Sequence, residues 1–254
     1  MNTQHTITEI GNSMKHWANY IHDVKRGAII NEGAIKYGIS EYLVASGSFA
    51  DYPYRNTNLG VPQIQKIKFE RTHDLFKNRR IDLSFNIDDG ENVIEVFFEF
   101  KYLNSAHLPE HEKDRYINDL FRLAALAKHY NESKKCECYF MLVGKPKKVE
   151  QLVIGNVTDT EHRRDNIKGL PKDNNSEIKD CFALEENGIK EVVLGDLSNG
   201  KGVSHLNRFE QDYIYRDEIK KQSKLDDSDC MMISLKYSTP SNEEVGVYIW
   251  QVKI

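Results

Sequence analysis

Long apolar stretches are absent from the sequence. No run approaches the about 20 consecutive apolar residues that a membrane-spanning helix needs. The N-terminal segment MNTQHTITEIGNSMKHW also lacks the continuous apolar core of a secretory signal. We therefore expect no membrane association and a cytoplasmic location.

Cysteine is scarce, with four residues in 254, and none of them form a CxxC pair. Structural zinc sites usually contain such pairs, so we expect no structural zinc. Cys136 and Cys138 are two apart in an expected strand and should share one face as small packing residues. His107 and His111 are four apart, but Pro109 argues against one helix presenting both to a metal.

Neither sign of charge dominates, since 35 Lys and Arg face 39 Asp and Glu, for a formal net charge of −4. The whole chain therefore has no general attraction for nucleic acid, and such binding would depend on local basic segments. Three of these are KNRR at 77–80, KK at 134–135 and KPKK at 145–148. With 39% hydrophobic and 29% charged residues, the composition is typical of a folded globular protein.

Apolar residues at three- and four-residue steps predict three helices. The first covers residues 12–26, with Asn12 or Ser13 as its cap. The second covers 28–47 and breaks or restarts near Gly38. Its apolar face contains a carboxylate, Glu32, beside Ala28, Ile35, Ile39 and Leu43. The third and strongest pattern covers 110–131.

Alternating or continuous apolar residues predict four strands in the first part of the chain. They lie at 63–72, 79–87, 92–103 and 138–144, and a turn at 88–90 joins the second and third into a hairpin. The apolar segment at 138–144 is typical of a strand covered on both faces. Strands combined with a long helix imply a mixed α/β sheet with flanking helices.

The last 100 residues contain no chemical motif. Residues 155–180 have the composition of a loop or insertion, 190–197 predict a strand, and 231–238 with 246–254 predict a C-terminal hairpin. We expect a core of residues 1–154, with 155–254 as a β-rich extension packed on the same domain.

The strand at 92–103 places charged residues among aromatic ones. Because side chains alternate along a strand, Glu95, Glu99 and Lys101 should share one face. In the preceding strand Ile81, Leu83 and Phe85 form the apolar set, and Asp82 points the other way, toward Glu99 if the register allows. Two adjacent carboxylates repel each other unless a cation neutralises them or one is protonated. Mg²⁺ commonly binds one or two carboxylates with water and phosphate oxygens, so a site for phosphodiester chemistry would explain these charges.

This order of elements, with Asp82 followed by Glu99-Phe100-Lys101, resembles the core of the PD-(D/E)xK nuclease superfamily over about residues 28–145. The resemblance implies a restriction-endonuclease-like core. It implies Asp82 and Glu99 as metal ligands, the Phe100 carbonyl as a third, and Lys101 as the catalytic lysine. Ile81 stands where the family name has proline.

The family often adds a glutamate from the first helix, for which Glu32 is favoured over Glu41. Asp119 and Arg122 form an ordinary i to i+3 pair in the third helix. The family often has residues that contact the site or substrate in this helix, which makes Asp119, Arg122 or Arg115 a candidate for such a role.

The resemblance thus implies a metal-dependent DNA nuclease that uses Mg²⁺, with Mn²⁺ as a substitute. Lys77, Arg79 and Arg80 would contact phosphates beside the cleaved bond. A restriction, defence or phage-related role follows only by analogy. One alternative is a catalytically silent module of the same fold that binds nucleic acid or protein. Another is that Glu95, Glu99 and Lys101 form an interface with the same residues of a second copy in a homodimer.

Overall fold

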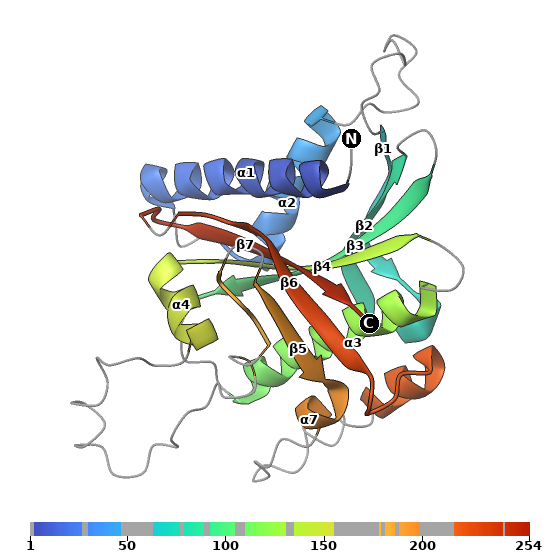
Figure 1. Ribbon diagram of the computed structural model, residues 1–254. Helices are drawn as coiled ribbons and strands as arrows, with labels where there is room; N and C mark the ends of the chain where they lie inside the picture. Colours follow the sequence, from blue (N-terminus) through green and yellow to red (C-terminus); the bar gives the residue numbers. More distant parts are fainter. Residues whose placement is uncertain are drawn as a thin grey trace, which may run out of the picture.

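A mixed seven-stranded sheet organises the protein, with helices on both of its faces (Figure 1). The computed structural model describes residues 3–26, 30–46, 63–76, 79–88, 92–104, 110–130, 135–154, 178, 181–185, 188–198, 216–240 and 242–254. The strands are β1 Gln63–Thr72, β2 Arg80–Asp88, β3 Val93–Leu103, β4 Cys136–Gly144, β5 Ile189–Val193, β6 Cys230–Ser238 and β7 Gly246–Lys253. The helices are α1 Thr3–Ile21, α2 Glu32–Ser46, α3 Glu110–Tyr130, α4 Pro146–Ile154 and α7 Leu194–Ser198. Two short helical turns, His22–Arg26 (η1) and Asp74–Phe76 (η4), complete the named elements.

The strand order is β1-β2-β3-β4-β7-β6-β5. β3 and β4 are parallel and are connected through α3, while the other neighbouring strands are antiparallel. The predicted mixed α/β class with flanking helices is therefore confirmed. The C-terminal hairpin is also confirmed, and its strand β7 pairs with β4 in the middle of the sheet.

Two apolar layers cover the sheet. On one face α1 and α2 pack through the buried residues Ile7, Ile10, Met14, Ile35, Ile39 and Leu43. On the other face α3 and α4 pack through Leu120, Leu123, Leu126, Val149 and Leu152. β4 is buried from Cys138 to Gly144, as its continuous apolar sequence predicts. None of the described helices has the length and hydropathy needed to cross a membrane.

The first predicted helix is correct in kind but wrong at its start. α1 begins at Thr3, because Ile7 and Ile10 extend the buried stripe of Met14 by further turns. Asn12 therefore lies inside the helix, where its side chain accepts a hydrogen bond from the Tyr237 hydroxyl at 3.1 Å and caps nothing.

The predicted break in the second helix is absent. α2 continues through Gly38, and a Cβ there would lie 2.9 Å from the Trp17 ring, so the glycine permits close packing of α1 on α2. α2 begins after Asn31, whose Oδ1 accepts a hydrogen bond from the Ala34 amide at 2.9 Å.

The strand predicted at 190–197 is only half correct. β5 ends at Val193, and Leu194–Ser198 forms α7. The amides of Leu194 and Gly195 donate to the carbonyls of Asp229 and Asp227, which turns the backbone away from the β5–β6 ladder. Of the predicted loop at 155–180, only residue 178 lies within the described part of the chain.

Candidate active site

The charged residues of β3 face α3. Glu99 and Lys101 are two residues apart, so they point to the same side of the sheet, where Asp119 and Arg122 lie one helical turn apart on α3. Arg122 Nε donates to Glu99 Oε1 at 2.9 Å, and Arg122 Nη2 lies 2.8 Å from the same oxygen. Lys101 Nζ lies 2.6 Å from Asp119 Oδ2, and Arg122 also pairs with Asp119. These four residues form one continuous buried chain of ion pairs.

Asp82 lies next to these ion pairs because β2 and β3 separate beyond Leu83 and Phe98. The β2–β3 ladder extends only from Asp88↔Val93 to Leu83↔Phe98. Beyond that point the Asp82 side chain replaces a backbone acceptor, since Phe100 N–H donates to Asp82 Oδ2 at 2.8 Å. Asp82 thus lies beside the Glu99–Phe100 peptide.

The same irregularity overturns one prediction. Ile81 packs in the α3-side cluster, whereas Leu83 and Phe85 pack on the opposite side with α2. The strict alternation predicted for these three residues is therefore broken next to Asp82.

The helix carboxylate beside the site is Glu32. Glu32 is the first residue of α2, and its Oε1 lies 3.6 Å from Lys101 Nζ. Glu32 lies one turn before Ile35, which is buried against the sheet, so both residues are on the same face of α2. This face places Glu32 near the ends of β2 and β3. Glu41 is exposed two turns further along α2. The structure thus brings Glu32, and not Glu41, to the charged cluster.

Sequence reasoning missed two further members of the site, Lys36 and Glu70. Lys36 Nζ lies 2.8 Å from Asp82 Oδ1 and also pairs with Glu70 of β1. The spacing of Glu32 and Lys36 contained a usable signal, because residues four apart share a helix face. Glu70 gave no such signal: it has a positive φ of 49° within β1, which an alternation pattern does not predict.

Burial determines the electrostatics of Glu99. Its side chain is fully buried, and its Oε2 has no hydrogen-bond partner among the described residues. Burial raises the pKa of Glu99 well above its usual value, against the attraction of Arg122, and the charges of Asp119 and Asp82 raise it further. Glu99 is therefore a carboxyl group whose charge is costly to hold in this fold.

The pKa values of Asp82 and Lys101 are shifted in the directions that favour their charged forms. Burial opposes the charge on Asp82, but hydrogen bonds from Lys36 and the Phe100 amide lower its pKa overall. Burial likewise opposes the charge on Lys101, yet Asp119 and Glu32 raise its pKa, so Lys101 is a held cation. Glu32 is the exception, since burial raises its pKa and the nearby Lys101 only partly offsets this.

The cluster has a formal excess of negative charge. Counted in their ionised forms, the four carboxylates Glu32, Asp82, Glu99 and Asp119 face three cations, Lys36, Lys101 and Arg122, which leaves one negative charge in excess. Glu70, the outer partner of Lys36, adds a second. A site of this charge balance attracts a further cation.

The donor set fits a hard divalent cation. Asp82 and Glu99 supply neighbouring carboxylates, and Glu99 Oε2 is a buried oxygen with no hydrogen-bond partner in the described part of the chain. Within the described residues no group of three or more His, Cys, Asp or Glu is arranged as a metal cage. Asp82 and Glu99 would thus supply two carboxylates to an ion such as Mg²⁺, which needs only one or two from the protein and otherwise binds water.

The predicted phosphate-binding residues lie just before Asp82. Arg79 and Arg80 are exposed at the start of β2, and Lys77 lies outside the described residues. Arg115 is exposed near the start of α3. The exposed side chains of Arg79 and Arg80 are thus within two or three residues of the cluster along the chain.

The charges on β3 are satisfied within one chain. Glu95 pairs with Arg71, and Glu99 and Lys101 are buried in the chain of ion pairs. Glu99 and Lys101 are therefore largely enclosed by their own chain, whereas Glu95 stays partly exposed.

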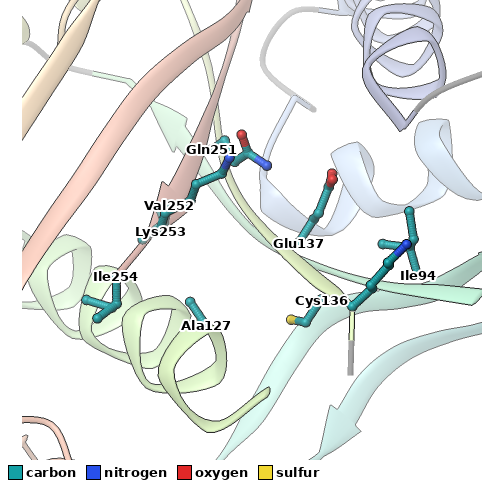
Figure 2. Close-up of a pocket in the computed structure, with 9 residues that line it drawn as sticks. Ile94, Ala127, Cys136, Glu137, Gln251, Val252, Lys253 and Ile254 are labelled. Carbon is teal, nitrogen blue, oxygen red and sulfur yellow. The ribbon is translucent and has the colours of Figure 1, made fainter. Parts of the chain in front are cut away.

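A cavity of about 360 Å³ lies away from the cluster, where β4 begins and β7 ends (Figure 2). It is lined by Ile94, Ala127, Lys135, Cys136, Glu137, Gln251, Val252, Lys253 and Ile254. In Figure 2 the Cys136 sulfur points toward α3 and the Glu137 carboxylate points away from it. Cys136 Sγ lies 3.7 Å from Cys138 Sγ, which confirms that the two thiols share a face.

No family model, curated protein or solved structure matches this chain. The interpretation of the cluster therefore depends on its own residues and geometry.

Proposed function

We propose that this protein is a metal-dependent nuclease that hydrolyses phosphodiester bonds of DNA, with Mg²⁺ as its metal and Mn²⁺ as a substitute. The observation that carries the proposal is the convergence of Asp82, Glu99 and Lys101 where β2 and β3 part. A fold that needed only stability would gain little from two adjacent carboxylates whose charges burial disfavours.

Each residue then has a chemical role. Asp82 and Glu99 would hold the metal, with the Phe100 amide fixing the orientation of Asp82. The bound metal would polarise a phosphate oxygen and acidify a water molecule. Lys101, held as a cation, would stabilise the negative charge that grows on the phosphate during attack. Glu32, about half exposed at the edge of the cluster, would accept a proton from the attacking water.

The substrate would approach from the exposed start of β2. Arg79 and Arg80, together with Lys77, would contact the phosphates on either side of the cleaved bond and would not read sequence. Lys36 competes with a metal for Asp82 Oδ1, so metal binding should depend on how readily this ion pair yields.

Cleavage assays test the proposal. Plasmid, linear duplex, single-stranded DNA and RNA would be incubated with the wild-type protein in Mg²⁺, Mn²⁺ or EDTA. We expect metal-dependent cutting of DNA, and a loss of at least about 100-fold in Lys101→Ala, as for removal of one stabilising charge. Lys128→Ala is the matched control, because Lys128 also pairs with an aspartate on α3's side of the sheet but lies outside the cluster. Equal loss in both variants would contradict the assigned role.

A catalytically silent binding module is the second candidate. It is favoured by the ion pairs within the cluster, in which Lys36 compensates Asp82, Arg122 compensates Glu99 and Asp119 compensates Lys101. Calorimetry with Mn²⁺ separates the two candidates. Binding that is lost in Asp82→Asn and Glu99→Gln supports the nuclease, whereas no binding and no cutting by wild type on any substrate supports the silent module.

A further inference from the structure

Lys101 has two carboxylate partners of unequal quality. Asp119 Oδ2 lies 2.6 Å from its ammonium, and Asp119 is only 3% exposed. Glu32 Oε1 lies at 3.6 Å, and its side chain is 46% exposed. A lysine ammonium lies at the end of a flexible four-carbon side chain, so its position is fixed only where a close partner holds it. Asp119 is therefore the residue that determines where the ammonium lies.

The backbone fixes Asp119 more firmly than it fixes Glu32. Asp119 lies in the middle of α3, among residues that are buried continuously from Tyr116 to Leu126. Arg122, one turn later, donates from Nη2 to Asp119 and from Nε to Glu99, and the same Nη2 lies 2.8 Å from Glu99 Oε1. The position of Asp119 is thus tied to that of Glu99, so α3 holds the carboxylate and the lysine of β3 in one fixed relation.

The ion pairs link Lys101 to Asp119 and, through Arg122, to Glu99 as well. Arg122 is shared between Glu99 and Asp119, so Lys101 supplies the second positive charge for these two buried carboxylates. The pair of Lys101 with Asp119 thus keeps a cation beside Glu99.

We propose that Asp119 is a positioning residue that holds the Lys101 ammonium beside Glu99 for the reaction. This inference rests on the proposed nuclease function for its catalytic consequence, while the holding itself is a property of the free protein. Asp119 touches neither metal nor substrate in this role and acts only through Lys101.

The kinetic test compares Asp119→Asn with Asp229→Asn. Both changes remove one carboxylate that pairs with a lysine, and the control breaks the Lys128–Asp229 contact of 2.8 Å outside the cluster. We expect Asp119→Asn to lower kcat by about 100-fold, with KM and Mn²⁺ affinity within about threefold, because the metal ligands and phosphate contacts remain. Asp119→Glu should recover part of kcat. Equal effects of the two Asn variants, or loss of Mn²⁺ binding in Asp119→Asn, would overturn the proposal.

A second measurement needs no substrate. Acetic anhydride labelling, followed by mass spectrometry of peptides, reports how accessible and how free each amine is. Lys101 should react slowly in wild type and at least about tenfold faster in Asp119→Asn, with Lys128 unchanged as the internal reference. An unchanged rate at Lys101 overturns the holding role. A raised rate, combined with no cleavage by wild type, supports the holding role and refutes only the nuclease function.

Discussion

Glu99→Gln separates a functional from a structural origin of the buried charge. Glu99 is fully buried, its Oε2 is unpartnered among the described residues, and Asp82 and Asp119 lie close enough to disfavour its charge. Glutamine keeps the shape of the side chain and removes the charge. Arg122 keeps Asp119 as a counter-ion in the variant, so no buried cation is left uncompensated.

The magnitudes favour a small gain in stability. Losing the charge-assisted bond from Arg122 costs about 1.5–3 kcal/mol. Removing the buried charge returns its desolvation penalty, which is at least about 1–3 kcal/mol and larger for a charged group. We expect Glu99→Gln to raise the free energy of unfolding at pH 7 by about 1 kcal/mol, equivalent to about 2–4 °C in Tm for a chain of this size.

The pH dependence follows from the raised pKa of Glu99. A group whose pKa is higher in the folded state binds its proton more readily there, so its contribution to stability is present below 4.5, its usual pKa, and is lost as pH rises. The advantage of Glu99→Gln should therefore be present at pH 7 and absent near pH 4.

The assay is thermal and urea unfolding at both pH values, with Glu95→Gln as the control on the same strand. Glu95 is partly exposed and pairs with Arg71, so its replacement should lower stability slightly. The reasoning is refuted if Glu99→Gln lowers the free energy of unfolding by about 3–5 kcal/mol, the effect of breaking a buried pair that serves the fold.

Two further predictions concern stability outside the cluster. Burial lowers the pKa of His73 to about 4 from its usual 6.5, so the folded state should lose about 2–3 kcal/mol between pH 7 and 4.5 as the unfolded chain takes up the proton. Urea unfolding of His73→Gln should show a flatter pH dependence, and an unchanged dependence would contradict this assignment. Gly11→Ala should destabilise the protein by about 1–3 kcal/mol, because the added Cβ would overlap the Tyr237 ring. Gly33→Ala, whose added Cβ meets only Asn31 Oδ1 at 3.2 Å, is its control in thermal unfolding.

Most elements of the fold could be predicted, because they depend on local periodicity. β1 matches its predicted range, and β2, β3, α3 and β4 differ from theirs by one or two residues at either end. The start of α1 and the end of β5 were predicted wrongly, because they depend on contacts with other parts of the chain. α1 starts early because a sparse stripe of Ile7 and Ile10 still faces the sheet, and β5 stops early because hydrogen bonds from residues 226–229 redirect the chain.

The candidate site could be predicted only in part. Alternation along β3 is sufficient to place Glu99 beside Lys101, since it follows from strand geometry alone. The position of Asp82 depends on where the β2–β3 ladder ends, which no pattern in either strand reveals. Asp119 and Arg122 have the spacing of an ordinary surface pair, and only their burial against β3 distinguishes them.

By itself, the sequence determined which residues share a face of a strand or helix, because side-chain direction follows from backbone periodicity. It thereby determined a mixed α/β fold and the motif of Asp82 followed by Glu99, Phe100 and Lys101. Tertiary structure alone decided that Lys36, Asp119 and Arg122 compensate these charges, and that β7 enters the sheet beside β4. Such contacts join residues far apart in the chain, and their energies depend on burial, which only the folded packing creates.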